Sequence, residues 1–178
     1  MADSFTFRIR PAEDRDIPDI RGIYNHYVTN SAVTFDEEES SLSSWRDKLS
    51  RLRRAGLPCL VAESPSGQIL GYALAQPWSA KAAYRFTVEE SIYLGQASTG
   101  KGLGRALLEA LITACEEAGI REVIAVISDR GAEASVALHR SLGFVEIGRM
   151  GRVGFKFGRW LGVINMQKSL RRSRAPHR

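Results

Sequence analysis

The feature that most constrains this chain is a glycine-rich turn between an apolar strand and an amphipathic helix, in YLGQASTGKGLGRALLEAL. Gly100, Gly102 and Gly104 have no Cβ, so the main chain can turn sharply there and approach a ligand closely. The helix that follows leaves its first N–H groups without intrahelical partners, and its dipole favours an anion at that end. Lys101 and Arg105 add positive charge nearby. The segment predicts a phosphate-binding turn made mainly of main chain, with a plain packing turn as the alternative.

The same segment differs by one residue from a triphosphate-binding P-loop. It contains Gly-x-x-x-x-Gly-Lys, but the next residue is Gly102, where a P-loop needs a Ser or Thr hydroxyl for Mg²⁺. A P-loop also follows the first strand of a parallel sheet, whereas this turn follows a series of strands. We therefore expect a diphosphate site that needs no metal.

Periodicity along the chain predicts one mixed-sheet α/β domain over residues 1–170. The sequence predicts, in order, a strand at 5–10, helices at 13–30 and 40–56, a hairpin at 57–78, a strand at 84–94, a helix at 104–119, a strand at 121–127, a helix at 132–143, and strands at 144–150 and 160–170. Gly56, Gly119 and Gly143 are expected to end the helices. The basic segment 171–178, RRSRAPHR, is predicted to be a solvated, disordered tail.

Composition narrows the location and the partners. No apolar run approaches the ~20 residues that span a bilayer, and the N-terminus lacks the apolar segment of a secretory signal. We therefore expect a cytoplasmic protein without membrane contact. Much of the net charge of +5 lies in the terminal segment rather than among aromatic residues, so no nucleic-acid partner is expected. Cys59 and Cys115 have apolar neighbours and no second ligand at metal-binding spacing, which predicts buried, reduced thiols and no metal.

Several segments resemble one family of enzymes. TGKGLGRALLEALI, after the strand EESIYL, resembles the acetyl-CoA loop of the GNAT superfamily of N-acetyltransferases, whose pattern is Gln/Arg-x-x-Gly-x-Gly/Ala. Gly102 and Gly104 match the two small positions, while Thr99 stands where the family has Gln or Arg. Four further stretches resemble the branch of phosphinothricin and methionine sulfoximine/sulfone acetyltransferases, and they span nearly the whole chain in the right order: IYNHYVTNSAVTFDEE, AYRFTVEESIYL, ASVALHRSLGF and VGFKFGRWLGVINMQKSL.

The resemblance implies a GNAT-type fold, with a mixed, mostly antiparallel central sheet and helices on both faces. It implies acetyl-CoA as a cosubstrate, with its diphosphate on the glycine-rich turn and its pantetheine arm paired to the strand before that turn. It also implies a homodimer. The residues so implied for acetyl-CoA binding are Ile92, Tyr93, Leu94, Thr99, Gly100, Lys101, Gly102, Leu103, Gly104, Arg105 and Ser135.

Acetyl transfer to an amine needs a group that takes the proton of the amine. The resemblance places a catalytic glutamate at Glu89, and strand alternation puts Glu90, the alternative, on the opposite face. His139 matches a histidine proposed as a catalytic partner in the phosphinothricin enzyme, with a cofactor contact or simple packing as alternatives. The N–H of Leu94 is a candidate donor to the oxyanion.

The residues predicted to form an acceptor pocket are Phe35, Lys81, Tyr84, Arg85, Lys156 and Trp160, with core packing as the alternative for the three aromatic residues. Related sequences often carry Arg-x-Arg where this chain has Ser79 and Lys81, and Asp where it has Gly162. Two arginines can grip a carboxylate bidentately, and one lysine cannot.

We therefore expect a small amino-acid substrate such as phosphinothricin, methionine sulfoximine or methionine sulfone. Two alternatives stay open: another amine (a polyamine, an aminoglycoside or a protein N-terminus), or a CoA-binding module without catalysis.

Overall fold

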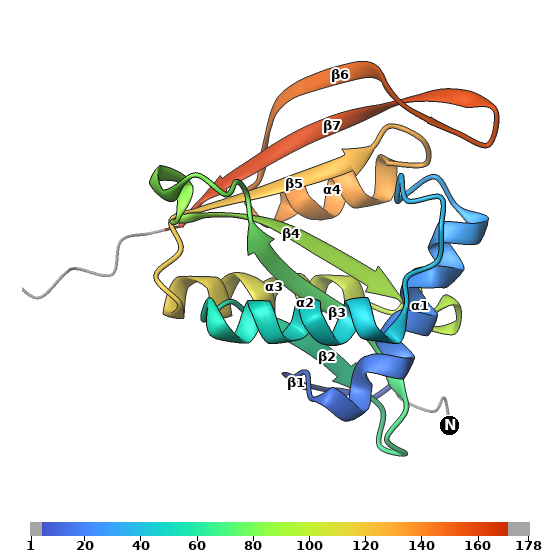
Figure 1. Ribbon diagram of the computed structural model, residues 1–178, viewed down its shortest axis with the longest axis vertical. Helices are drawn as coiled ribbons and strands as arrows, with labels where there is room; N and C mark the ends of the chain where they lie inside the picture. Colours follow the sequence, from blue (N-terminus) through green and yellow to red (C-terminus); the bar gives the residue numbers. More distant parts are fainter. Residues whose placement is uncertain (1–4, 171–178) are drawn as a thin grey trace, which may run out of the picture.

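The computed structural model describes residues 5–170, so the predicted tail at 171–178 lies outside the described residues. Seven strands form one sheet in the order β1-β2-β3-β4-β5-β7-β6 (Figure 1). The strands are β1 (Arg8–Pro11), β2 (Cys59–Glu63), β3 (Ile69–Pro77), β4 (Thr87–Leu94), β5 (Glu122–Ser128), β6 (Val145–Lys156) and β7 (Arg159–Ser169). The helices are α1 (Ile17–Asn30), α2 (Leu42–Arg54), α3 (Leu103–Glu117) and α4 (Glu133–Ser141), with short 3₁₀ helices η1 (Asp14–Asp16), η2 (Ala82–Tyr84) and η3 (Gln96–Ser98).

The predicted order of elements is confirmed, and the helix ends lie where the sequence places them. The Ser41 side chain accepts the N–H of Ser44 at 3.0 Å and so caps the start of α2. Gly56, Gly119 and Gly143 follow α2, α3 and α4 with positive φ. Within residues 5–170, every helix is too short or too polar to cross a bilayer.

Three strand boundaries were predicted wrongly. β1 begins at Arg8 rather than at Phe5. β4 begins at Thr87 rather than at Tyr84, because Tyr84 belongs to the 3₁₀ turn η2. β6 runs to Lys156, six residues beyond the predicted end at Met150. Most of β6 is exposed and pairs only with β7, and its register shifts twice, so it lacks the buried alternation that identifies a strand in a sequence.

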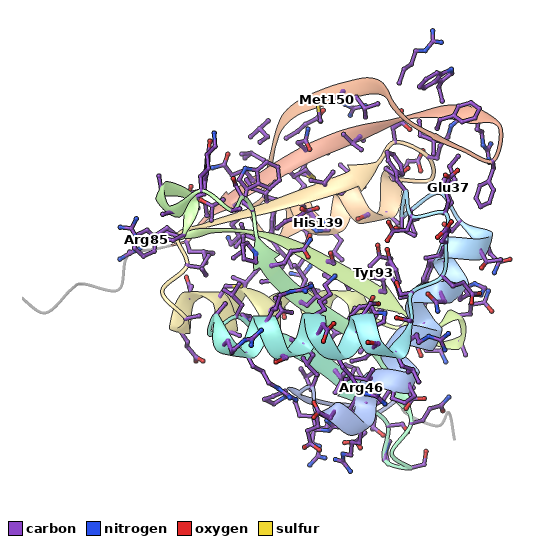
Figure 2. The ribbon with its side chains drawn as sticks, viewed as in Figure 1. Glu37, Arg46, Arg85, Tyr93, His139 and Met150 are labelled. Atoms are coloured by element: carbon purple, nitrogen blue, oxygen red, sulfur yellow. The ribbon has the colours of Figure 1, made fainter. Side chains whose placement is uncertain are left out.

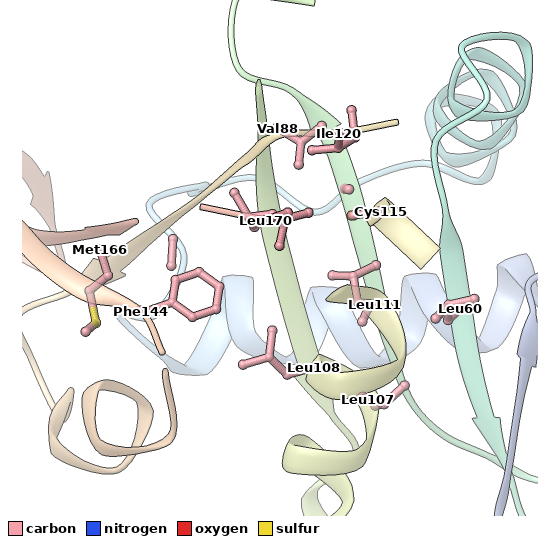
Figure 3. Packing of buried hydrophobic residues seen from close by; sticks show 14 of the residues in the cluster. Leu60, Val88, Leu107, Leu108, Leu111, Cys115, Ile120, Phe144, Met166 and Leu170 are labelled. Carbon is pink, nitrogen blue, oxygen red and sulfur yellow. The ribbon is translucent and has the colours of Figure 1, made fainter. Parts of the chain in front are cut away.

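Helices cover both faces of the sheet. On one face, α1 and α2 pack through residues such as Ile20, Trp45 and Leu49 onto Tyr72 and Leu74. On the other face, α3 and α4 enclose a second cluster, centred on the leucines of α3, that includes Phe144 and Met166 (Figure 3). Neighbouring residues along β2 and β3 alternate between the two clusters, as the pleat of a strand requires.

The two central strands diverge. β4 and β5 are the one parallel pair in the sheet, and their pairing ends at Glu89↔Ile124 although both strands continue (Figure 1). The remaining half of β4, up to Leu94, has β3 on one side and no β5 pairing on the other. The gap between these two strands positions the candidate site.

Candidate active site

A cavity of about 700 Å³ lies where β4 and β5 separate. Its walls come from the second half of β4, the turn before α3, the end of β5, the first turns of α4 and the loop after α1. These segments are far apart in the sequence, and the divergence of the strands brings them together. Of the residues predicted for cofactor binding, Ile92, Tyr93, Leu94, Thr99, Gly100, Gly102, Gly104, Arg105 and Ser135 line this cavity.

The main chain of β4 presents alternate residues to the cavity. Gly95 donates its N–H to Leu70 of β3 at 2.8 Å, and Trp78 donates to Thr87 at 3.2 Å, so the odd-numbered residues of β4 bond to β3. The main-chain N–H and C=O groups of the even-numbered residues point to the opposite side, where β5 no longer pairs with β4. The N–H and C=O groups of Ile92 and Leu94 therefore face the gap, and the Leu94 carbonyl accepts the Tyr27 hydroxyl at 2.5 Å.

The glycine-rich turn has the backbone that its sequence predicts. Gly100 and Gly102 have φ of 73° and 80°, and Gly102 is the residue from which α3 starts. A left-handed φ at two positions turns the chain abruptly, which directs the first N–H groups of α3 outward.

The basic residues of the turn differ in their placement. Arg105 lines the cavity, bonded to Glu109 and to Ser141 at 3.0 Å each. The Lys101 ammonium lies over the Phe5 ring at 4.8 Å, and Leu103 is fully buried in the core. Neither Lys101 nor Leu103 lines the cavity.

Glu89 is a half-buried carboxylate in the cavity wall. Burial raises its pKa above the usual value of 4.5, and the adjacent charge of Glu90 raises it further. The hydrogen bond from Gln76 and the charge of Lys48 on α2 act in the opposite direction without cancelling the shift. A raised pKa makes this carboxylate a stronger base than a solvated one.

His139 contacts Glu90, not Glu89. The two side chains are buried, with Nε2 of His139 2.5 Å from Oε1 of Glu90. The other ring nitrogen, Nδ1, lies 2.7 Å from the carbonyl oxygen of Ser135, one turn earlier on α4. Burial lowers the pKa of His139, but the hydrogen bond and the charge of Glu90 outweigh it, so that the pKa is raised.

One wall of the cavity is formed by the loop between α1 and α2. Val33, Thr34 and Phe35 of this loop line the cavity. Lys156 of β6, only 2% exposed, donates to the carbonyl oxygens of Ser31 at 2.8 Å and Thr34 at 2.9 Å. Lys156 was predicted to contact substrate, but the structure gives its ammonium two loop carbonyls as partners and places it outside the cavity lining.

Phe35 packs on β6 at Gly154. A Cβ added to Gly154 would lie 2.5 Å from two atoms of the Phe35 ring, so only glycine lets the ring approach this closely. Lys156 and Gly154 together fix the loop against the sheet, in a manner that the sequence did not reveal.

Besides Lys156, four residues predicted for the acceptor pocket lie outside the cavity lining: Lys81, Tyr84, Arg85 and Trp160. Figure 2 shows Arg85 at the edge of the molecule, away from Tyr93 and His139. Arg85 lies over the Phe86 ring at 4.5 Å, and Trp160 is 52% exposed beside Phe155 on the β6–β7 hairpin. These four residues are not brought together with Glu89.

Tyr27 and Arg130 are among the cavity-lining residues that sequence reasoning missed. Tyr27 lies on α1, and its hydroxyl donates to the carbonyl oxygen of Leu94 at the end of β4. Arg130 follows β5 and adds a cation to the cavity wall. No local pattern distinguishes Arg130 from an ordinary surface arginine, because its role depends on the divergence of β4 and β5.

The space beside Gly162 is filled by other groups of the chain. A Cβ at Gly162 would lie 2.6 Å from Oδ2 of Asp129 and 2.6 Å from the carbonyl oxygen of Met150. Asp129 at the end of β5 therefore occupies the space into which a side chain at position 162 would project. Among residues 5–170, no group of three or more His, Cys, Asp or Glu side chains is arranged to hold a metal ion.

Comparison with known proteins identifies the family. The model of the Acetyltransferase (GNAT) family matches residues 20–144. This chain belongs to the GNAT acetyltransferase family. The predicted resemblance and fold class are thereby confirmed, and the seven-stranded, mostly antiparallel sheet agrees with them.

Several relatives of this GNAT acetyltransferase carry the names of the predicted branch. Phosphinothricin N-acetyltransferase of Alcaligenes faecalis is 42% identical over 162 residues, covering 91% of this chain and 82% of that protein. L-methionine sulfoximine/L-methionine sulfone acetyltransferase of Pseudomonas aeruginosa is 41% identical, covering 91% and 94%. The crystal structure of a GNAT phosphinothricin acetyltransferase from Sinorhizobium meliloti, in complex with AcCoA, has a TM-score of 0.88 and 42% identity, covering 93% of this chain and 89% of that one.

Proposed function

We propose that this GNAT acetyltransferase moves the acetyl group of acetyl-CoA directly to the amine of a small amino acid, of the phosphinothricin, methionine sulfoximine or methionine sulfone type. The observation that carries the proposal is one cavity that combines the glycine-rich turn, the free main-chain edge of β4 and the basic carboxylate of Glu89. The names of the relatives support the substrate class.

The residues present fit acetyl-CoA, which supplies an activated acetyl thioester when bound. The N–H groups at Gly100 to Gly104 and the start of α3 would hold its diphosphate, with Arg105 beside them. Ile92 would offer its outward N–H and C=O groups to the amides of the pantetheine arm, and Leu94 would meet the thioester end through its N–H. Ser135, at the start of α4, would contact the same molecule from the other wall.

Two groups of the chain would perform the chemistry. The N–H of Leu94 points into the gap and would donate to the acetyl oxygen as negative charge develops on it. The Glu89 carboxylate would take the proton of the amine, directly or through a water molecule. Because only the ionised carboxylate can do so, activity should fall as the pH drops through the raised pKa of Glu89.

A second substrate class is favoured by one observation. The chain has Ser79 and Lys81 where related sequences often have two arginines, and Lys81 lies outside the cavity lining. An acceptor without a carboxylate, such as a polyamine, an aminoglycoside or a protein N-terminus, does not need a bidentate clamp.

We further propose a cytoplasmic homodimer. The exposed face of β6 is unusually apolar for an edge strand, with Val145, Ile147, Met150, Val153 and Phe155 each at least half exposed. A second copy that covered this strand would bury these side chains. Analytical ultracentrifugation should give twice the monomer mass of 19.7 kDa, and a monomer at micromolar concentration would reject the dimer.

The function is tested by measuring the release of free CoA with a panel of amines. Turnover with phosphinothricin or methionine sulfone, exceeding that with spermidine, an aminoglycoside and a peptide, supports the first substrate class. The reverse order supports the second. Calorimetric binding of acetyl-CoA in EDTA without turnover on any amine would instead indicate a CoA-binding module, and absence of binding would reject the proposed cosubstrate.

A further inference from the structure

Glu90 and His139 form a buried pair in the cavity wall that the proposed chemistry does not use. Their side chains are 4% and 6% exposed, and both residues line the cavity. The imidazole packs edge-on against Phe144, with ring centres 5.0 Å apart, which fixes the plane of the ring. Figure 2 shows His139 in the interior of the molecule, behind the central strands.

The hydrogen bonds of His139 determine how many protons the pair holds. Nδ1 lies 2.7 Å from the carbonyl oxygen of Ser135, and because a carbonyl oxygen only accepts, Nδ1 carries a proton. The contact of 2.5 Å between Nε2 and Oε1 of Glu90 needs a second proton, since otherwise two lone pairs would face each other. Wherever that proton sits, the pair has no net charge. Both ring nitrogens are occupied, so neither is free to take a proton from an amine.

The charge of the pair affects the ionisation of Glu89, because Glu89 is the neighbour of Glu90 on β4. Glu89 and Glu90 are consecutive on β4, and the charge of Glu90 acts on Glu89. From the other elements, Lys48 of α2 and Gln76 of β3 face Glu89. Cys115 of α3 and Tyr93 of β4 face Glu90, and both stay neutral near pH 7, because burial raises the pKa of each above its ordinary value.

We propose that His139 is a positioning residue that compensates the charge of Glu90, and that this pair thereby sets the proton affinity of Glu89. With the pair intact, the imidazole offsets the charge of Glu90, and Glu89 ionises more readily than it would beside an uncompensated Glu90. Without the imidazole, the wall gains a negative charge close to the carboxylate, which then holds its proton more tightly. The inference rests on the proposed function only in taking Glu89 as the base.

The test compares three variants by the pH profile of kcat/KM. In His139→Gln, the amide still donates to Glu90 but carries no charge, so the acidic limb should move up by about one pH unit. In the double variant E90Q/H139Q, the wall is neutral again, and the limb should return to the wild-type position. Glu90→Gln alone should move the limb slightly down. A directly catalytic histidine could not be rescued by removing Glu90, and a purely structural pair would make the double variant the worst of the three.

A second readout separates this inference from the function of Glu89. The carboxyl carbons are followed by NMR titration in protein labelled with ¹³C-glutamate, and the Glu89 signal is assigned by its loss in Glu89→Gln. The Glu89 titration should move upward in His139→Gln and revert in the double variant, even if Glu89→Gln proves fully active and so removes Glu89 from the role of base. An unchanged Glu89 titration in His139→Gln, or a shift that persists in the double variant, overturns the inference. Thermal unfolding and acetyl-CoA titration verify that each variant is folded, and His139→Asn replaces His139→Gln if that variant is not.

Discussion

The two ends of the cavity differ in the kind of protein group that forms them. At the proposed cofactor end, the turn at Gly100 and Gly102 and the outward edge of β4 offer main-chain groups. At the proposed acceptor end, the wall is a loop that Lys156 and Gly154 fix to a distant strand. A site made of main chain depends on backbone conformation, whereas a site made of side chains depends on tertiary contacts.

Glu89 lies between the two ends, and its loss should have the largest effect. Replacing Glu89 by Gln keeps the size of the side chain but removes its basicity, so kcat/KM should fall by roughly 10²-fold or more. The dissociation constant of acetyl-CoA should stay the same, because the carboxylate is not part of the cofactor end. Steady-state release of CoA and calorimetry measure the two quantities. Unchanged turnover would mean that another group takes the proton.

The next largest effect tests whether the cofactor end depends on backbone conformation. Gly102 has φ of 80° and no atom within 4 Å of an added Cβ, so Gly102→Ala would act through the backbone alone. A left-handed alanine costs about 1–2 kcal/mol. The free variant relieves this strain by leaving the left-handed conformation and must recover it to bind, which predicts about tenfold weaker binding of acetyl-CoA. Gly119→Ala is the matched control. Gly119 has φ of 82° and no atom within 4 Å of an added Cβ, but it follows α3 and lies outside the cavity lining, so calorimetry should show unchanged binding. Equal losses in the two variants would contradict this assignment.

A smaller effect, at the opposite end, tests the contact between the loop and β6. Gly154→Ala would push the Phe35 ring away and with it the wall of the acceptor pocket. Overpacking of this kind costs about 1–3 kcal/mol, so the KM for the amine should rise at least about fivefold. The affinity for acetyl-CoA should not change, because the cofactor end is built from other segments.

The control for this contact is Gly148→Ala on the same strand, where an added Cβ meets nothing within 4 Å. This variant should leave the KM for the amine unchanged. If Gly154→Ala weakened acetyl-CoA binding as much as it raised the KM for the amine, the division of the cavity into two ends would be wrong.

The same division explains what could be predicted from the sequence. The glycine-rich turn, the helix after it and the strand with Glu89 are local patterns, and the structure places them as expected. The partner of His139 could not be read from the sequence, because it depends on how α4 packs on β4. The role of Lys156 was equally hidden, since its partners lie more than 120 residues away in the chain.

The smallest effect is expected at Thr99, the one position of the turn that departs from the family pattern. Its hydroxyl donates to the carbonyl of Gln96 at 3.2 Å, and the residue is exposed. Thr99→Gln restores the family residue and adds one solvent-exposed hydrogen bond at most, worth about 0.5–1 kcal/mol. We therefore expect acetyl-CoA to bind no more than about threefold more tightly, because Gly100 and Gly102 already supply the conformation that orients the N–H donors. A gain of tenfold or more in calorimetry would show that a side chain, and not the main chain, dominates the cofactor end.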